Sequence, residues 1–275
     1  TTGTNNSAIG YLALYRNITG ANNSAVGSSS LCSNTTGSYN NAFGSGALYS
    51  NTTGYSNTAL GDNTLYSNTE GVNNVAVGAG GLYSNESGAN NVAVGISSLE
   101  SNTTGTNSVA IGFRALKENT TGGENTAIGK DALGLNDSGS YNNAIGSGAL
   151  YANTTGIANN AVGNDALGLN YSGSVNNAFG SGALYANTSG SSNNAVGSNA
   201  LGNNDTGSYN SAMGDIALNR NVSGSHNTAM GEGSLYSITD GEYNAALGSF
   251  AGFGLGSGTY NVFIGANSGC LLYTS

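Results

Sequence analysis

Twelve asparagines offer the covalent chemistry that recurs most often along this chain, because each is followed two residues later by Ser or Thr. Asn-x-Ser/Thr is the acceptor sequence for N-linked glycans. The twelve lie whole multiples of 17 residues apart: Asn17, Asn34, Asn51, Asn85, Asn102, Asn119, Asn136, Asn153, Asn170, Asn187, Asn204 and Asn221. Two more matches, at Asn5 and Asn22, arise only because Ser follows a pair of asparagines. The pattern predicts a row of glycan acceptors.

Turn chemistry is the alternative interpretation of the same asparagines. Five copies read Asn-Thr-Thr-Gly, as at 51–54. In bends of this kind the Asn side chain caps the backbone and Gly adopts a positive φ. Asn68 favours the turn, because it keeps its place although Thr69 and Glu70 destroy the acceptor pattern. Both interpretations stay open.

Catalysis has little support among the residue types present. The single histidine, His226, stands where other copies mostly carry Tyr, Asn or Ser, so we expect a solvated turn residue and not a general base. Five carboxylates follow the recurring glycine in separate repeats, so the repeat fixes no acid–base pair: Asp62, Asp131, Asp165, Asp215 and Glu232. A Ca²⁺ ion near Asp131 or Asp165 is an alternative that would need several oxygen ligands. We predict a non-enzyme with no catalytic residue, cofactor or metal.

A 17-residue repeat must position all these residues. Gly10 and fifteen later glycines, ending at Gly265, recur every 17 residues without insertion or deletion. The consensus is N-x-A-h-G-x-x-A-L-Y-x-N-T-T-G-x-x, in which h is apolar. The repeat lacks the 3.6-residue periodicity of a helix. It can hold two short strands, N-x-A-h-G and x-A-L-Y, each followed by a bend.

The uninterrupted period predicts that each copy stacks on the one before as a coil of a parallel β-solenoid. The expected fold is therefore all-β, a β-roll or β-helix of sixteen coils. It is regular over 1–248 and divergent over 249–275, a cap or junction in which Phe250 and Phe253 interrupt the pattern. Equivalent side chains stack, and stacked Asn columns can hydrogen-bond between coils.

The solenoid separates the two cysteines. Cys32 and Cys270 occupy the same place in the repeat, fourteen coils apart, which corresponds to roughly 65 Å at the strand spacing. Disulfide Cα atoms lie within ~7 Å of each other, so the prediction excludes a bridge between them. We expect space-filling thiols, with a bridge between two chains at Cys270 as the alternative.

Alternation along a strand places the Ala and h columns on opposite faces. A 17-residue coil has little interior volume, so we predict Ala and Leu inside and the h column outside. An uncovered apolar stripe of that length exceeds ordinary exposed patches, which makes it the predicted oligomer interface: Ile9, Val26, Phe43, Leu60, Val77, Val94, Ile111, Ile128, Ile145, Val162, Phe179 and Val196. The alternative buries the h column, leaves Ala outside and needs no partner.

Composition limits the partners. The 275 residues include 46 Gly, no Pro and only 7% charged residues, with a net charge of −9. Such a chain lacks the basic face that nucleic acids require. No apolar run has the length of a transmembrane helix. We therefore predict no nucleic-acid partner and no membrane span in this segment.

The motif Asn-x-Ala-h-Gly, as at 74–78 and 91–95, resembles the head repeats of trimeric autotransporter adhesins of the YadA type. The longer unit at 142–151 is similar to repeats in bacterial and phage tail-fibre-like proteins. This resemblance spans the chain and implies a parallel β-roll, commonly trimeric, in an extracellular fibre or adhesive head. The unit is longer than the adhesin repeat, and these residues include no coiled-coil stalk or anchor barrel, so anchoring and trimerisation come by analogy alone.

Together these observations predict a non-catalytic rod in an extracellular or cell-surface fibre or adhesin. It would self-associate as a homotrimer, or end to end as a filament through unpaired strand edges. One alternative is a head that binds a host-surface or glycan ligand through exposed Tyr and Asn columns. The other is an ice-binding solenoid that uses the Ser/Thr column of Thr36 and Thr53, although bends do not present a flat row.

Overall fold

The computed structural model describes residues 2–269, and in this part of the chain the regular secondary structure consists of three-residue strands joined by turns. The described residues form two compact units, 2–140 and 141–269. Unit 1 contains β1 (Ser7–Ile9), β2 (Ser24–Val26), β3 (Asn41–Phe43), β4 (Thr58–Leu60), β5 (Val75–Val77), β6 (Val92–Val94), β7 (Val109–Ile111) and β8 (Thr126–Ile128). Unit 2 contains β9 (Asn143–Ile145), β10 (Asn160–Val162), β11 (Asn177–Phe179), β12 (Asn194–Val196), β13 (Ser211–Met213), β14 (Thr228–Met230), β15 (Ala245–Leu247) and β16 (Val262–Ile264).

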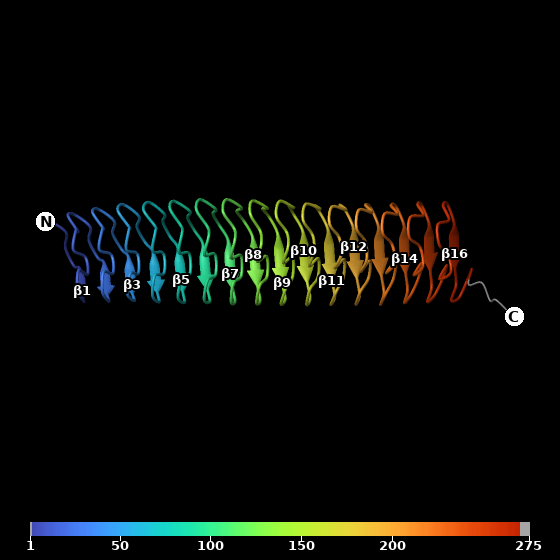
Figure 1. The fold of residues 1–275 in the computed structure, drawn as a ribbon, viewed down its shortest axis with the longest axis horizontal. Coiled ribbons are helices and arrows are strands. Elements are labelled where there is room, and N and C mark those ends of the chain that lie inside the picture. Colours follow the sequence, from blue (N-terminus) through green and yellow to red (C-terminus); the bar gives the residue numbers. More distant parts are fainter. Residues whose placement is uncertain (1, 270–275) are drawn as a thin grey trace. The chain divides into compact units, whose positions relative to one another are not determined.

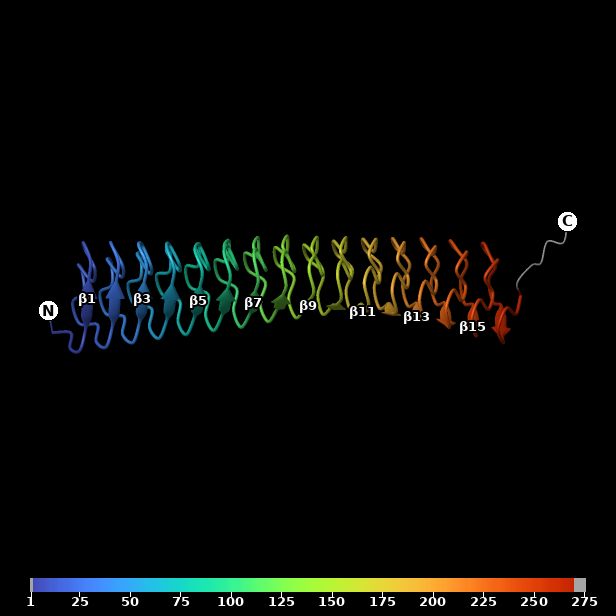
Figure 2. The same ribbon diagram turned by 90° about the horizontal axis from the view of Figure 1, so that it is seen from below.

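Every coil contributes one strand, and within each unit consecutive strands pair in parallel (Figure 1 and Figure 2). Residues 17 apart are register partners, as Ala76 and Ala93 are in the pair β5–β6. The same register holds in unit 2, where Ala161 pairs with Ala178. The predicted all-β parallel solenoid of 17-residue coils is therefore confirmed.

The interior is made of small and branched side chains in columns. The middle residue of each strand from Ala25 to Ala229 is a fully buried alanine, and the leucines at every seventeenth residue from Leu31 to Leu235 are fully buried as well. The third strand residue points the other way, so that Ile111, for example, is 40% exposed. The h column thus lies outside, and the alternative with a buried h column is wrong.

The predicted second strand, x-A-L-Y, is also wrong. Consecutive residues Ala115 and Leu116 are both fully buried, which a strand does not allow because its side chains alternate between faces. Every second residue of this segment instead has a left-handed backbone conformation, for example Ser97 (φ 55°) and Leu99 (φ 51°). Its N–H groups still bond to neighbouring coils, since Ser97 N donates to Ala79 O at 3.0 Å and Leu99 N to Ala115 O at 3.0 Å.

Holding a leucine in the left-handed region costs about 1–2 kcal/mol. Complete burial of a Leu side chain contributes roughly 1.5–3 kcal/mol. The two terms are of similar size, so the conformation persists where the coil can bury its leucine fully. This condition explains why the position is occupied by Leu in coil after coil.

Two glycines per coil permit the close stacking. Gly112 has φ +138°, and a Cβ atom there would lie 2.4 Å from Gly129 O in the next coil. A Cβ atom on Gly54 would lie 2.4 Å from Asn51 Oδ1 and 2.5 Å from Gly71 O. Each glycine is therefore required by the neighbouring coil, which accounts for the unbroken period.

After residue 248, one interior position carries a smaller side chain than in earlier coils and another carries a larger one. Gly252 stands where earlier coils carry the buried Leu, and Phe263 stands where they carry the buried Ala. A Cβ atom on Gly252 would lie 2.7 Å from Phe263 Cδ2 and 2.8 Å from Leu235 Cδ2. The phenylalanine ring therefore occupies space that leucine fills elsewhere.

Candidate functional site

The predicted glycan acceptors lie inside the coils. Eleven of the twelve are fully buried, and only Asn17 is half-buried. Asn51 shows the arrangement: its Nδ2 donates to Gly54 O in the same bend at 2.9 Å and to Asn34 Oδ1 in the preceding coil at 2.8 Å. The N–H groups of Thr52, Thr53 and Gly54 all point to Thr69 O of the next coil.

This bend ladder, Asn17 to Asn221 at every seventeenth residue, includes Asn68. Asn68 donates to Asn51 Oδ1 at 2.8 Å and to Gly71 O at 3.1 Å, although its acceptor pattern is broken. The turn interpretation accounts for it, since the ladder needs Asn and not the Ser or Thr that follows. A glycan on Nδ2 would replace one of the two bonded hydrogens, so a glycan and the ladder exclude each other at the buried positions.

A second ladder, the strand-entry ladder, is formed by the asparagine before each strand. Asn40 Nδ2 donates to Gly54 O at 2.9 Å, so this carbonyl accepts from both ladders. Asn40 Oδ1 accepts the backbone N–H of Asn57 at 3.0 Å. Buried amide groups are costly unless bonded, and here each bond also fixes the register of two coils.

The bend ladder ends in unit 2, where Ile238 takes the place of the asparagine. Asn221 Oδ1 is buried and has no hydrogen-bond partner. Ile238 is fully buried itself. An apolar residue here leaves the carbonyl of the last ladder asparagine unsatisfied, so these two coils lack the side-chain hydrogen bond that joins earlier neighbours.

The predicted interface residues form one exposed column in each unit. Ile9, Phe43, Leu60, Val94, Ile111, Ile128, Ile145, Val162, Phe179 and Val196 are exposed, and Val26 and Val77 are half-buried. Met213, Met230, Leu247 and Ile264 continue the column in unit 2. We call the side chains of the first and third strand residues the outer face. Whether a partner covers it stays a prediction.

The outer face has no charged residue. The first strand residues are Ser, Asn, Thr, Val or Ala, and the third are all apolar. In unit 2 the amides of Asn143, Asn160 and Asn177 each donate to the next asparagine along the row at 2.8 Å. The chain has a net charge of −9, but none of that charge lies on the outer face.

A shallow apolar groove of about 150 Å³ crosses the outer face of β14–β16. Its lining includes the third strand residues Met230, Leu247 and Ile264, the first strand residues Thr228 and Val262, and the middle residues Ala246 and Phe263. The small side chain of Ala245 leaves this space open. The groove is part of the apolar outer face and carries no separate chemistry.

Exposed and half-buried aromatic rings stack along other columns. Tyr209, His226, Tyr243 and Tyr260 form a continuous pile with centroid distances of 5.0, 4.7 and 5.1 Å. Tyr49, Tyr66 and Tyr83 form a second pile at 5.0 and 5.2 Å. The prediction for His226 as a solvated turn residue overlooked that it stacks between two tyrosines. Its place in a column with Tyr209 and Tyr243 was visible in the sequence and could have shown this.

The Ser/Thr column considered for ice binding lies in the bends. Thr36 and Thr53 are exposed, but both stand in turns and not on the strands. The neighbouring hydroxyls are engaged between coils, since Thr35 Oγ1 donates to Thr52 O at 2.9 Å. Ice binding stays an untested alternative, which a thermal-hysteresis measurement can test.

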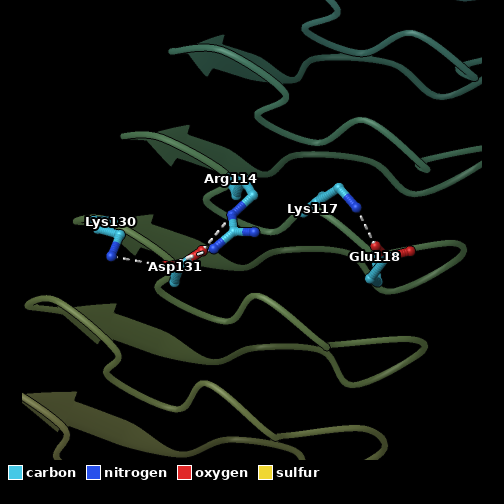
Figure 3. Close-up of polar contacts among 5 residues, drawn as sticks. All are labelled: Arg114, Lys117, Glu118, Lys130 and Asp131. Carbon is cyan, nitrogen blue, oxygen red and sulfur yellow. Dashed lines mark hydrogen bonds and ion pairs between the residues drawn. The ribbon is translucent and has the colours of Figure 1, made fainter.

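Three of the five cationic residues lie in two adjacent coils (Figure 3). Arg114 binds both carboxylate oxygens of Asp131, at 2.8 and 3.1 Å, and Lys130 lies 3.6 Å from the same carboxylate. Lys117 donates to Glu118 at 2.6 Å. This hydrogen bond lowers the pKa of Glu118 and raises the pKa of Lys117, although burial opposes both shifts.

The candidate acid–base and metal residues lie apart. Asp131 is held by Arg114, and Asp62 accepts the backbone N–H of Ser45 at 3.0 Å. Among the described residues no three His, Cys, Asp or Glu side chains lie close enough to hold a metal ion. Cys32 is a buried free thiol. Cys270, and with it the alternative of a bridge between two chains, lies outside the described residues.

Within residues 2–269 no helix is long and apolar enough to cross a bilayer. The chain matches no known protein-family model and no curated protein sequence.

Proposed function

We propose that this chain is a non-catalytic structural segment of an extracellular fibre or adhesin, and that copies of it associate through the outer face. The observation that carries the proposal is the exposed, uncharged column running along the strands of each unit. Monomeric proteins rarely expose apolar patches larger than a few hundred Å². A regular column of this kind is typical of a surface that another chain covers.

The rest of the surface favours the same role. Charged residues make up only 7% of the chain, and those described lie outside the strands. Buried ladders and glycines hold the coils together, so the backbone of the outer face is already ordered before association and little backbone freedom is lost. Both properties favour a structural role over a catalytic one.

The test is the oligomeric state of the purified chain and of two charge variants. Val94→Glu with Ile111→Glu places two carboxylates on the outer face and is expected to convert the associated chain into a monomer. Ser87→Glu with Thr104→Glu adds the same charge in exposed bends and serves as the matched control. Circular dichroism checks that both variants fold.

Sedimentation velocity then decides. The proposal requires wild type and the bend variant to sediment as the same oligomer. A wild-type chain that stays monomeric at tens of micromolar would overturn it. The extracellular location has a separate test, in which antibodies against the chain label intact source cells or particles without permeabilisation.

A ligand-binding head is the second candidate, and the aromatic pile of unit 2 favours it. Tyr260 is 76% exposed and Tyr209 61% exposed, which leaves a row of ring edges and phenol groups at the surface. Aromatic side chains combine an apolar ring with a polar group, as glycan-binding surfaces require. Glycan-array binding that disappears in Tyr243→Ala, and persists in Tyr66→Ala, would support this candidate.

A further inference from the structure

Two acceptor sequences differ from the bend ladder in where the structure places them. Asn5 and Asn22 precede the strand-entry asparagines Asn6 and Asn23. Asn5 is exposed and Asn22 half-buried. The same place in later coils is also at the surface, since the side chains there are exposed at Asn73, Asn90 and Asn107. Accessibility is therefore a property of this position in the coil.

The side chain of Asn22 has the freedom that the ladder asparagines lack. Its Oδ1 accepts one exposed hydrogen bond, from Asn5 Nδ2 at 3.3 Å. No bond joins Nδ2 of Asn22 to any other residue in the described part of the chain. Asn22 has a left-handed backbone (φ 57°) and is half-buried, whereas the following Asn23 is only 1% exposed.

The third residue of each acceptor sequence is accessible as well. Ser7 and Ser24 are the first residues of β1 and β2, and their side chains belong to the outer face. Ser7 is exposed and Ser24 half-buried. Residues two apart along this segment thus present both parts of the acceptor pattern to solvent, while the residue between them is directed inward.

We propose that Asn5 and Asn22 are the N-glycan acceptor sites of the folded protein, and that the buried members of the bend ladder are not modified once the chain has folded. The co-substrate class is a sugar activated by a diphosphate at its anomeric carbon. A bond forms between Asn Nδ2 and the anomeric carbon, the bond from that carbon to the diphosphate oxygen breaks, and the diphosphate leaves with its carrier group while the amide loses one proton.

The experiment uses the folded chain, a soluble N-linking hexosyltransferase that recognises Asn-x-Ser/Thr, and a nucleotide-activated hexose. Intact mass and peptide mapping are expected to show one hexose on Asn5 and one on Asn22, with Asn34 to Asn221 bare. Ser24→Ala removes the Asn22 acceptor pattern without touching the asparagine and is expected to lose one hexose.

Two variants that each create a new acceptor sequence test whether modification depends on the exposure of the asparagine or on the acceptor sequence alone. Val92→Ser creates an acceptor sequence that begins at the exposed Asn90 and is expected to add one hexose there. Glu70→Thr restores the acceptor sequence that begins at the buried Asn68 of the bend ladder and is expected to add none. Short peptides carrying each acceptor sequence verify that the enzyme accepts them when unfolded.

Hexose on Asn51, or on Asn68 in the Glu70→Thr variant, while the chain remains folded would overturn the proposal. So would bare Asn5 and Asn22 in a chain whose matching peptides are modified. The readout is independent of self-association, so this proposal and the proposed function can fail separately.

Discussion

At the scale of single residues, the buried asparagine amides bind one coil to the next. Each ladder asparagine donates to a carbonyl in its own bend and to the asparagine of the coil before, as Asn102 does with Gly105 at 3.1 Å and Asn85 at 2.7 Å. Within the ladder, a buried amide donates to the asparagine of one neighbouring coil and accepts from that of the other. Removing one asparagine side chain therefore affects three coils.

Asn102→Ala is expected to lower the free energy of unfolding by about 2–4 kcal/mol. The substitution leaves Asn85 Oδ1 without its donor and one N–H of Asn119 without its acceptor, and each unsatisfied buried group costs about 1–3 kcal/mol. Urea unfolding of purified protein measures the change.

Thr104→Ala is the matched control, because it destroys the same acceptor pattern at an exposed side chain. A change within about ±0.5 kcal/mol is expected. If the control destabilised the chain as much as Asn102→Ala does, the ladder would not be the reason for the recurring asparagine.

The Lys117–Glu118 pair makes a small, pH-dependent contribution. The pKa of Glu118 is lowered by its hydrogen bond from Lys117, so its contribution is present above the unfolded pKa of about 4.3 and is lost as pH falls through the folded pKa. Both side chains are a third or more exposed, and exposed pairs contribute about 0–1 kcal/mol.

Glu118→Gln is therefore expected to reduce stability by less than about 1 kcal/mol at neutral pH, and this difference is expected to disappear as the pH falls through the folded pKa of Glu118. Thermal unfolding of both proteins across this range measures the difference. A destabilisation by Glu118→Gln that grows as the pH falls would contradict the lowered pKa of Glu118.

At the scale of the structural element, the left-handed turn segment decides which substitutions a coil tolerates. Gly80 has φ +68°, and a Cβ atom there would meet only Ser97 Oγ at 3.8 Å. The adjacent Gly81 has no positive φ, and its Cβ atom would lie 3.4 Å or more from every neighbour. The two positions differ in backbone conformation and little in available space.

Gly80→Ala is expected to destabilise the chain by about 1–2 kcal/mol through the left-handed backbone alone. Gly81→Ala is expected to stabilise it by about 0.4–1 kcal/mol, because it restricts the unfolded chain. Equal effects of the two substitutions in urea titrations would show that the conformational argument is wrong.

The pairing of a small Gly252 with a large Phe263, in place of the Leu and Ala of earlier coils, gives a second test at this scale. Phe263→Ala removes a half-buried ring and is expected to cost up to about 3 kcal/mol, at or below the lower end for a fully buried Phe. Gly252→Leu in the same chain restores the Ala-and-Leu pattern of earlier coils and is expected to recover most of that loss.

Gly252→Leu alone is expected to destabilise, since its side chain would collide with Phe263. The double-mutant cycle therefore predicts a favourable coupling between the two substitutions, of about 1–3 kcal/mol for residues in contact. Additive effects would contradict the packing described for these coils.

At the scale of the whole molecule, an uncharged face on an acidic chain determines how association responds to salt. Two copies with a net charge of −9 repel each other at long range, and salt screens this repulsion. Sulfate also strengthens apolar burial. The proposed association is therefore expected to become tighter with added sodium sulfate, and sedimentation at several salt concentrations measures this. Weaker association would indicate ion pairs across the interface.

The sequence alone determined the coil. The period of 17, the recurring Gly10 position and the alternation of Ala and h residues required stacking of equivalent strands, because no helix fits that spacing and like residues must align. The outward h column also followed from the small interior volume, as exposed Ile111 shows. These features depend on local periodicity, which a sequence displays directly.

Only the tertiary structure decided what the asparagines do and where the second half of the coil runs. Asn51 could be a surface acceptor or a buried ladder residue by its sequence, and the choice depends on the amides of Asn34 and Asn68 in neighbouring coils. Leu99 appeared to belong to a strand, but its left-handed backbone is set by packing that the sequence does not show. Contacts between coils, not local preference, decided both, for the physical reason that a buried amide and a strained φ are stable only when their neighbours are in place.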